Sequence, residues 1–579
     1  MTRLFNDPAA FADEMIDGFV AANSTQVRRV QGGVVRSTVS TPGSVAVVIG
    51  GGSGHYPAFG GIVGQGLAHG AAMGNLFASP SAQQVHSVAK AADLGGGILL
   101  TYGNYAGDVL NFNAAQEQLR AAGVDTRTVT VTDDVASASV AEKHRRRGIA
   151  GDLTVFKTAA AASEAGYSLD EVERVAVLAN ERTRSFGVAF TGCTLPGADE
   201  PLFTIPDGRM GVGIGIHGEP GIDETDIPTA DGLAELLVSK LLTELPDGIE
   251  DARGQRATVI LNGLGSVKYE ELFVVYRRVA ALLDEAGVTV VEPEVGELVT
   301  SFDMAGASLT LFWLDDELEG FWRAPADTPA YRKGSVGAVE QASFTEALEV
   351  SQEIPDATPE SQAAARTAYL VIEAIAAVID ENVDELGRID AVAGDGDHGI
   401  GMQRGSHAAQ AAALDVLIAG AGAQTLLERA GDAWADRAGG TSGALWGSAL
   451  RAVAAELGDT DDPTAASVGA GVQAAKNAIL TFGAVVGDKT MVDTLVPFAD
   501  TLTREIDGGG SLTASWTVAV DAATEAAAAT ADLLPKMGRA RPHAEKSLGT
   551  PDAGAHSLAL IVQRIGAVLK NDVLKKEDN

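Results

Sequence analysis

Cysteine is almost absent from this sequence, because Cys193 is the only one in 579 residues. A single cysteine excludes an internal disulfide framework and a zinc site built from four cysteines, and it is typical of proteins that fold in a reducing compartment. Cys193 lies in an apolar run, so we interpret it as a small packed side chain, with a reactive thiol as the alternative.

Basic residues are scarce as well, with 42 Lys and Arg against 78 Asp and Glu and a formal net charge of −36. Nucleic acid and anionic membranes repel such a chain, so we expect neither as a partner. The one dense basic run, residues 143–147, is interpreted as a solvated helix end. An anionic substrate would need local positive charge, which a metal ion would supply.

Several other signals are missing. The N-terminus has no basic-then-apolar signal pattern, and no uninterrupted apolar run reaches the roughly 18 residues that span a bilayer. We therefore expect a soluble, cytoplasmic protein. The sequence has no Walker A lysine motif, and its first glycine cluster does not fit the dinucleotide fingerprint, so any ATP site must be of another kind.

The length and the 46% hydrophobic content predict two or three folded domains. Up to about residue 335, short β-branched runs alternate with helical stretches, which indicates an α/β unit with a division near residues 185–200. The predicted strands are residues 44–49, 97–101, 128–132, 257–261 and 288–291.

The composition changes after residue 335. Residues 336–360 mix acidic, polar and proline residues without a period, so we predict a linker there. Residues 361–579 are rich in alanine and have helical periodicity, with helices expected over residues 363–380 and 515–534. The fold class predicted is an α/β unit over residues 1–335 followed by an all-helical unit.

Glycine clusters mark the candidate site of the α/β unit. The cluster GGGSGH, residues 50–55, follows the first of these strands, and ligands collect beyond the carboxyl ends of strands in open α/β sheets. His55, Asp108 and His217 all lie in glycine-rich segments and could form an acid, base and nucleophile set. The alternative is ordinary glycine turns with satisfied histidines and Asp108 as a helix cap.

Three carboxylates stand close together in the helical half. Asp390, Asp395 and Asp397 are separated by glycine and follow a long predicted helix. Their spacing does not fit an EF-hand, but hard oxygen ligands on a flexible turn suit Mg²⁺, which completes its shell with phosphate and water. A solvated acidic turn is the alternative.

Further loops of the helical half could donate hydrogen bonds to a nucleotide. Residues 439–443 (GGTSG) offer backbone N–H groups and hydroxyls at a helix N-terminus. Residues 487–491, Arg539 and residues 551–554 add polar loops. Taken singly, each of these segments is more often an ordinary loop.

Seven motifs occur in one order: GGGSGH, NYxGDxxNF, GIHGEPG, GDGDHG, GGTSGALWG, GDKTM and SLGTPDAGA. Over nearly its whole length the chain resembles the single-chain, ATP-dependent dihydroxyacetone kinase family. The resemblance implies a ketose-binding unit of two α/β subdomains and a barrel of antiparallel helices that binds ATP with two Mg²⁺ ions. It also implies a homodimer in which the nucleotide unit of one chain serves the ketose site of the other.

The resemblance also implies site residues. His217 would bind the substrate carbonyl covalently as a hemiaminal, Asp108 would accept the hydroxyl proton, and His55 would hydrogen-bond the hemiaminal oxygen. The implied ketose contacts are Gly52, Ser53, Gly54, His55, Tyr56, Gly103 and Asp108. The implied metal ligands are Asp390, Asp395 and Asp397, and the implied nucleotide contacts are His398, Thr441, Ser442, Gly487, Thr490, Met491, Arg539, Asp552, Ala553 and Gly554.

Two departures from the family pattern concern the substrate. The dihydroxyacetone enzymes usually carry lysine where this chain has Gly103, and they read GHEPAH where residues 54–59 read GHYPAF. Loss of the lysine stem leaves room for a larger ketose. The sequence is similar to the erythrulose kinases, with D-erythrulose phosphorylated at its 4-hydroxyl favoured.

Four alternatives stay open. Two are kinases of the same kind that act on dihydroxyacetone, or on the 1-hydroxyl of L-erythrulose. The third is a regulatory protein that only senses a ketose, against which the retained His217, Asp108 and metal carboxylates argue. The fourth is a nucleotide lyase activity on FAD, which would need only the helical unit and Mn²⁺.

Overall fold

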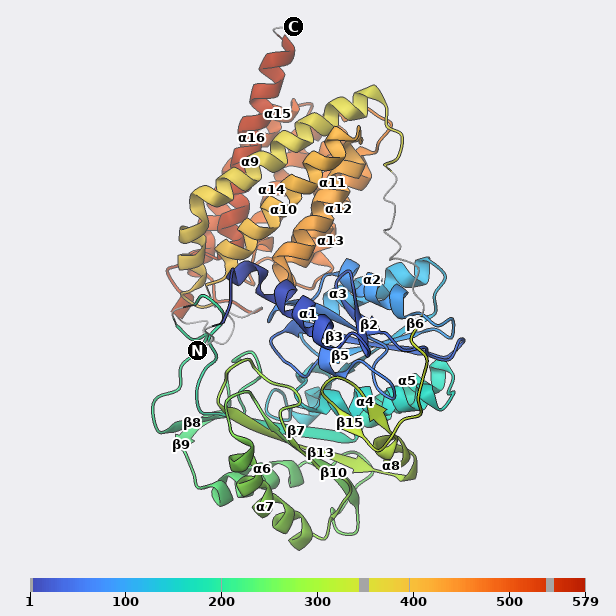
Figure 1. The fold of residues 1–579 in the computed structure, drawn as a ribbon. Helices are drawn as coiled ribbons and strands as arrows, with labels where there is room; N and C mark the ends of the chain where they lie inside the picture. The colour runs from blue at the N-terminus through green and yellow to red at the C-terminus, as the bar shows by residue number, and fades with distance from the viewer. Residues whose placement is uncertain (1–3, 199, 343–353, 395, 538–545, 578–579) are drawn as a thin grey trace. The chain divides into compact units, whose positions relative to one another are not determined.

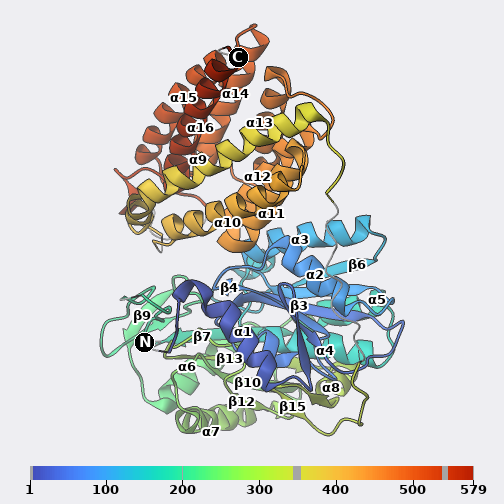
Figure 2. The same cartoon turned by 45° about the horizontal axis from the view of Figure 1, so that its top comes forward.

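The computed structural model describes residues 4–198, 200–342, 354–394, 396–537 and 546–577. The chain forms two compact units, Met1–Ala347 and Leu348–Asn579 (Figures 1 and 2). Residues 343–353 of the predicted linker 336–360 lie outside the described residues. The boundaries at 335 and 360 therefore stay a prediction.

The first unit contains a mixed sheet with the order β1-β2-β4-β3-β5-β6. Its strands are β1 (Val27–Val30), β2 (Gly33–Arg36), β3 (Ala46–Ser53), β4 (Gly70–Leu76), β5 (Ile98–Gly103) and β6 (Thr126–Val131). The predicted strands 44–49, 97–101 and 128–132 are thus confirmed as β3, β5 and β6. The four strands β4, β3, β5 and β6 are parallel, so their carboxyl ends share one edge.

Alternate residues of the central strands bury their side chains on opposite faces of this sheet, as the two-residue period of a strand requires. Val48 and Leu100 join a core with α2 and α3, whereas Val47 and Leu99 join a core with α4 and α5. The helices of this subdomain are α1 (Phe11–Ala22), α2 (Ala82–Ala92), α3 (Ala106–Ala121), α4 (Gly151–Glu164) and α5 (Leu169–Glu181), with short 3₁₀ turns at Pro8–Ala10, Gly60–Ile62 and Val140–Arg145.

A second mixed sheet begins at Thr183, close to the division expected near residues 185–200. Its order is β11-β10-β13-β7-β8-β9, with β12 also paired to β10. The strands are β7 (Thr183–Ala189), β8 (Arg209–Val212), β9 (Asp223–Asp226), β10 (Arg256–Gly263), β11 (Thr289–Val290), β12 (Glu294–Gly296) and β13 (Gly306–Leu314). The predicted strands 257–261 and 288–291 are confirmed as β10 and β11.

Helices α6 (Ala230–Leu242) and α7 (Tyr269–Glu285) pack against the second sheet, and α8 (Asp316–Arg323) packs against α4. A two-stranded ribbon, β14 (Ala326–Asp327) with β15 (Arg332–Lys333), follows α8. The two α/β subdomains predicted for this unit are therefore present.

Two local predictions for this unit are wrong in part. The strand predicted to end at residue 49 continues through the first glycines of the GGGSGH cluster to Ser53. It passes so close to β4 that a Cβ on Gly50 would lie 2.4 Å from the Ala72 carbonyl oxygen. The basic run 143–147 is a solvated helix end only over residues 143–145, and its last two residues are held inside the unit. Arg146 is buried against Glu244, at 2.5 and 2.8 Å, and Arg147 pairs with buried Asp134 at 2.7 Å.

The second unit is all-helical in its described residues, as predicted. Each helix packs against the next, and α16 packs back on α9, which closes the ring (Figure 2). The helices are α9 (Pro359–Asp390), α10 (His398–Ile418), α11 (Ala423–Ala438), α12 (Gly440–Leu457), α13 (Ala465–Leu480), α14 (Val492–Asp507), α15 (Leu512–Ala529) and α16 (Ala553–Glu577). The predicted helix 363–380 lies within α9, and 515–534 corresponds to α15 and a 3₁₀ turn at Thr530–Asp532.

Helix α9 is long and apolar enough to cross a membrane if judged by length and composition alone. It is nevertheless a core helix of this unit. Ile372, Ile375 and Ile379 are buried, and α9 packs against α10, α11 and α16. A core helix that contacts several neighbours is expected to have the same apolar composition. The composition of α9 therefore does not by itself indicate a membrane-spanning helix.

Candidate active site

Two histidines that are 162 residues apart in the sequence meet at the carboxyl edge of the first sheet. His55 follows β3 and His217 follows β8, and their Nε2 atoms are 3.0 Å apart. His55 is buried, its ring stacks on Phe77, and its Nδ1 lies 2.7 Å from the Thr300 carbonyl oxygen. Burial, together with the neighbouring His217, lowers the pKa of His55 to about 3. His55 is therefore neutral at physiological pH.

Glu219 holds His217 from the other side. One Glu219 carboxylate oxygen is 3.0 Å from His217 Nδ1, and the other accepts the backbone N–H of His217 at 3.0 Å. Burial acts to raise the pKa of Glu219, but His217 and Arg147 outweigh it and hold this pKa well below its usual range. Arg147 lies 3.8 Å from Glu219 and is itself anchored by Asp134.

These contacts constrain the protons of the histidine pair. The Thr300 carbonyl and the Glu219 carboxylate are both acceptors, so each Nδ1 must carry a proton. The two Nε2 atoms then face each other at 3.0 Å, a distance at which one of them donates to the other. Because burial lowers the pKa of His55 to about 3, His55 is the acceptor in this pair, and Glu219 lies on the opposite side of His217.

Asp108 is a buried carboxylate in the first turn of α3. Within the part of the chain that the structure describes, its Oδ1 is buried and has no hydrogen-bond partner. Burial raises the pKa of Asp108 to about 7, although Ser79 and His217 act in the opposite direction. A carboxylate with such a pKa can accept a proton near neutral pH.

Tyr105 is a direct neighbour of His217. Its ring packs edge-on against His217 with 4.5 Å between centroids, and its hydroxyl donates to the Gly148 carbonyl at 2.8 Å. Gly103, at the end of β5, lies against this ring, since a Cβ there would be 3.2 Å from Tyr105 Cε2. Gly103, Asp108, His55 and His217 thus surround one region at the sheet edge.

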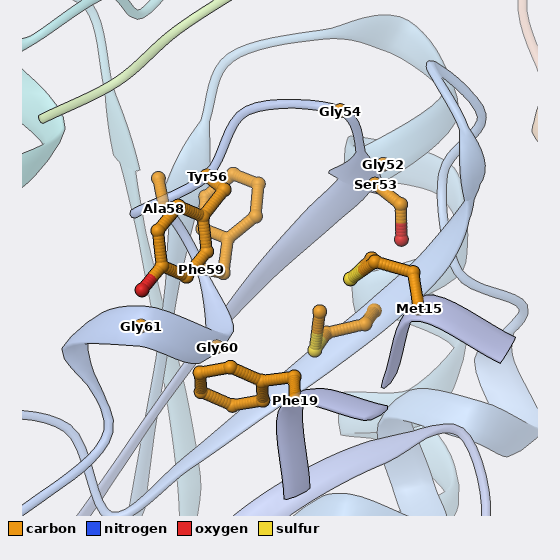
Figure 3. A pocket seen from close by; sticks show the side chains of 11 residues that line it. Met15, Phe19, Gly52, Ser53, Gly54, Tyr56, Ala58, Phe59, Gly60 and Gly61 are labelled. Carbon is orange, nitrogen blue, oxygen red and sulfur yellow. The ribbon is translucent and has the colours of Figure 1, made fainter. Parts of the chain in front are cut away.

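The remaining ketose contacts expected from the motifs line a small cavity beside α1. Gly52, Ser53, Gly54 and Tyr56 lie on its wall, and Met15 and Phe19 of α1 close one side (Figure 3). The Ser53 hydroxyl donates to the Gly74 carbonyl at 2.6 Å, so its proton is already engaged. The cavity lining does not include His55, Asp108 or His217, and a role for Ser53 or Tyr56 in binding stays a prediction.

In the helical unit, α9 ends at Asp390 and α10 begins directly after Asp397. Asp395 lies outside the described residues, and among the described ones no group of three or more His, Cys, Asp or Glu forms a metal cluster. Asp390 Oδ2 is nevertheless buried and has no hydrogen-bond partner in the described structure. Burial and the nearby Asp390 raise the pKa of Asp397 to about 6. These carboxylates fit a cation.

A second segment brings acidic groups to the same end of the helical unit. Asp552 precedes α16 and accepts the backbone N–H of Ala555 at 2.7 Å. Burial, together with the nearby Asp493 and Asp390, raises the pKa of Asp552 to about 7. His398 contacts the Ser557 hydroxyl at 3.0 Å, and burial lowers its pKa.

The other nucleotide contacts expected from the motifs lie in loops and first helical turns. Thr441 and Ser442 are in the first turn of α12, and Ala553 and Gly554 begin α16. Met491 packs against Gly554, where a Cβ would lie 3.4 Å from Met491 Cβ. The loop with Gly487 and Thr490 is organised by Asp493, which accepts the backbone N–H groups of both residues at 2.6 and 2.8 Å. Arg539 lies outside the described residues.

Family models match both units of the chain. Residues 17–330 match the Dak1 domain, and residues 392–567 match the DAK2 domain. The chain belongs to the dihydroxyacetone kinase family.

Relatives in this family match the chain along its full length. It is 62% identical to an L-erythrulose kinase of Pectobacterium atrosepticum over 99% of this chain and 97% of that one. It is 55% identical to a D-erythrulose kinase of Mycolicibacterium smegmatis, over 98% of each chain. The dihydroxyacetone kinase of C. freundii, solved with AMP-PNP and Mg²⁺, is 28% identical with a TM-score of 0.52, over 98% of this chain and 99% of that one.

The sequence motifs alone do not identify several residues of this site. Glu219 and Tyr105 lie inside the motifs GIHGEPG and NYxGD, but only the fold reveals that both contact His217. The basic run that includes Arg147 suggests a solvated surface until Asp134 is seen beside it. Lys489 of GDKTM is buried and donates to the carbonyl oxygens of Leu533 and Ser547, so it holds two loops of the helical unit together.

Proposed function

We propose that this kinase transfers the γ-phosphoryl group of ATP to a terminal hydroxyl of erythrulose, held as a covalent hemiaminal on His217. The observation that carries the proposal is the pairing of His217 with Glu219 and His55 beside the buried carboxylate of Asp108. Family membership supports the ATP-dependent kinase class, and the relatives at 62% and 55% identity support erythrulose.

The hemiaminal step follows from the protons of the histidine pair. His217 Nε2 attacks the ketone carbon, so that an N–C bond forms and the C=O double bond becomes a C–O single bond. The proton shared between the two Nε2 atoms passes through His55 to the carbonyl oxygen, which becomes a hydroxyl. Glu219 keeps the proton on Nδ1 of His217 and balances the charge that the imidazole ring carries. A polyol without a carbonyl cannot bind in this way.

The transfer step assigns Asp108 as the base. The hemiaminal fixes the ketose, so that its terminal hydroxyl is held near the Asp108 carboxylate. Asp108 accepts the hydroxyl proton as the oxygen attacks the γ-phosphorus and the bond to the β-phosphate oxygen breaks. The pKa of about 7 suits a base that acts near neutral pH.

Asp390, Asp395 and Asp397 would hold Mg²⁺ in the helical unit, with two ions expected from the family resemblance. When bound, the metal neutralises phosphate charge. The chain itself places backbone N–H groups and hydroxyls at the start of α12 and α16, which would bind phosphate or the nucleoside. We propose in addition that the active form is a homodimer with a site shared between chains.

The stereoisomer has two candidates. The family resemblance favours D-erythrulose phosphorylated at its 4-hydroxyl. The second candidate is L-erythrulose, which the higher identity to the L-erythrulose kinase, 62% against 55%, favours. Dihydroxyacetone is the three-carbon alternative.

The test is a coupled kinase assay of the full chain with Mg-ATP and four acceptors: D-erythrulose, L-erythrulose, dihydroxyacetone and glycerol. We expect one erythrulose isomer to have the highest kcat/KM and glycerol to be inert. A higher value for dihydroxyacetone would overturn the four-carbon assignment. A chain that binds a ketose but does not phosphorylate it would instead favour a sensor. Cleavage of FAD with Mn²⁺ and no ketose would favour a lyase.

The covalent step has its own test. With a ketose labelled with ¹³C at the carbonyl and no ATP present, NMR should show a protein-bound sp³ carbon. His217→Ala should lose this signal and the kinase activity, whereas the exposed His144→Ala should keep both. Full activity in His217→Ala would overturn the hemiaminal.

A further inference from the structure

Buried polar atoms without partners gather around the carboxyl end of β5. Within the described chain, Thr101 Oγ1, Tyr102 Oη, Asp108 Oδ1 and Asp152 Oδ1 are all buried and make no hydrogen bond. Burying a polar atom without a hydrogen-bond partner costs free energy. A buried atom of this kind is therefore a candidate to bind a ligand that supplies the missing hydrogen bond. Asp108 is explained by the proposed transfer step. Asp152 has no role in that step.

Asp152 is the second residue of α4 and is 2% exposed. Two glycines lie directly against its carboxyl group. A Cβ on Gly148 would lie 2.8 Å from Asp152 Oδ1, and a Cβ on Gly103 would lie 3.4 Å from Asp152 Oδ2. A side chain at either position would lie against the carboxyl group, so the glycines leave it bordered on this side by backbone alone.

Asp152 is also close to the proposed chemistry. The same Cβ position on Gly103 is 3.2 Å from the Tyr105 ring, and this ring packs edge-on against His217. Asp152 therefore lies close to the aromatic ring that packs against the proposed nucleophile. Asp108 is near enough to influence its ionisation.

The charge state of Asp152 suits a neutral hydroxyl as ligand. Burial raises its pKa well above the usual range, and the nearby Asp133 and Asp108 raise it further. A neutral carboxylic acid has both a donor and an acceptor, as an alcohol has, and it does not require a counter-ion.

We propose that Asp152 binds the hydroxyl that a four-carbon ketose carries in addition to those of dihydroxyacetone, and so selects four-carbon over three-carbon substrates. Dihydroxyacetone has no group at this position and would leave Asp152 without a partner. A site built to bind a hydroxyl rejects an analogue that lacks it, because the buried polar group is then unpaired. This assignment rests on the proposed ketose kinase function.

The experiment measures kcat/KM for erythrulose and for dihydroxyacetone in parallel, with Mg-ATP saturating. Asp152→Ala should lower kcat/KM for erythrulose by roughly 10-fold to 100-fold and for dihydroxyacetone by less than about 3-fold. Asp152→Asn, which keeps a donor and an acceptor, should restore most of the difference. Binding of each ketose without ATP, measured by calorimetry, should change in the same direction.

Two further variants separate specificity from folding. Asp133→Asn alters a neighbouring buried carboxylate that accepts the backbone N–H groups of Ile149 and Gly151, so it should affect both ketoses equally. Gly103→Ala places a methyl group against Tyr105 and Asp152 and should lower the preference for erythrulose even if Asp152→Ala does not fold.

The outcomes are distinguishable. Equal losses for both ketoses in Asp152→Ala, or no loss in any variant, would overturn the role of Asp152 while leaving the kinase function intact. A wild-type chain that phosphorylates no ketose would overturn the proposed function itself, and the assignment of Asp152 with it.

Discussion

Glu219 determines which ring nitrogen of His217 carries a proton, although Glu219 contacts no substrate in the proposed reaction. Its carboxylate accepts the proton of Nδ1 and would stabilise the positive ring that forms when Nε2 attacks the ketone. Replacing the carboxylate beside a catalytic imidazole with an amide removes the negative charge and weakens the preference for one tautomer.

Glu219→Gln should therefore lower kcat/KM for the ketose by at least about 10-fold and weaken hemiaminal formation in the absence of ATP. The assay is the kinase reaction together with the ¹³C signal of the bound ketose. The exposed Glu270→Gln is the matched control. Normal hemiaminal formation in Glu219→Gln would show that Glu219 does not set the state of His217.

The buried carboxyl group of Asp108, which the proposed reaction requires, should lower the free energy of unfolding of the chain. The folded chain binds its proton more tightly than the unfolded chain, because burial raises its pKa to about 7 from the ordinary value of 3.8. The free energy of unfolding therefore falls as pH rises from about 4 to about 7, by up to about 4 kcal/mol from this group alone.

Asp108→Asn carries no such penalty. At pH 8.5 the variant should be more stable than the wild type by a few kcal/mol, and at pH 5.5 the difference should be smaller. Denaturant unfolding at the two pH values measures this, and the kinase assay should show that the variant is inactive. A difference that does not change with pH would mean that Asp108 is ionised without penalty.

At the scale of elements, the end of β3 sets the position of His55. Gly54 has a φ of +106°, and a Cβ there would lie 2.7 Å from the Phe77 ring, on which His55 stacks. A side chain at this position would therefore strain the backbone and displace the surface that supports the imidazole ring.

Gly54→Ala should destabilise the chain by about 2 to 4 kcal/mol and lower kcat more than the loss of folded protein explains. Gly123→Ala is the control, since Gly123 also has positive φ, +84°, but open space around its Cβ position. Thermal melting and the kinase assay compare the two variants. Equal effects would mean that backbone strain alone, without the Phe77 contact, explains the result.

The elements were predictable where a local pattern decides them. The runs at residues 44–49 and 97–101 are strands because β-branched and apolar side chains fill both faces of a buried parallel sheet. The pattern failed at Gly50 to Ser53, which remain in β3 because β4 approaches closely, a contact between segments about 20 residues apart.

The site was predictable only in part, for a related reason. Family motifs point to His55, Asp108 and His217, but the partners of these residues come from distant segments. Arg147 is recognised as part of the site only when Asp134 and Glu219 are placed beside it. A basic run of sequence carries no information on which of its members is buried.

At the scale of the whole molecule, the chain separates the two reactants. The histidine pair belongs to the unit Met1–Ala347, whereas Asp390 and the other proposed metal ligands belong to Leu348–Asn579. Each unit has its own core and carries its own set of proposed site residues. Phosphoryl transfer requires the two sets to meet, either within one chain or across a dimer.

A complementation experiment distinguishes these possibilities. His217→Ala lacks the proposed nucleophile and Asp390→Asn lacks a proposed metal ligand, so each variant alone should be inactive. If the site is shared between chains, a heterodimer of the two has one complete site, made from the intact ketose unit of one chain and the intact helical unit of the other. Random pairing in a two-fold dimer then recovers about a quarter of the wild-type activity.

The two variants would be co-expressed with different affinity tags, and the heterodimer would be isolated through both. The reference is a heterodimer of His217→Ala with Asp415→Asn, because Asp415 is exposed in α10 and its substitution should leave the helical unit intact. Its activity is compared with that of the His217→Ala and Asp390→Asn heterodimer. If each chain uses its own two units, neither subunit of the His217→Ala and Asp390→Asn heterodimer has a complete site. The doubly tagged species would then be inactive, which would contradict the shared site and leave the chemistry of each unit unchanged.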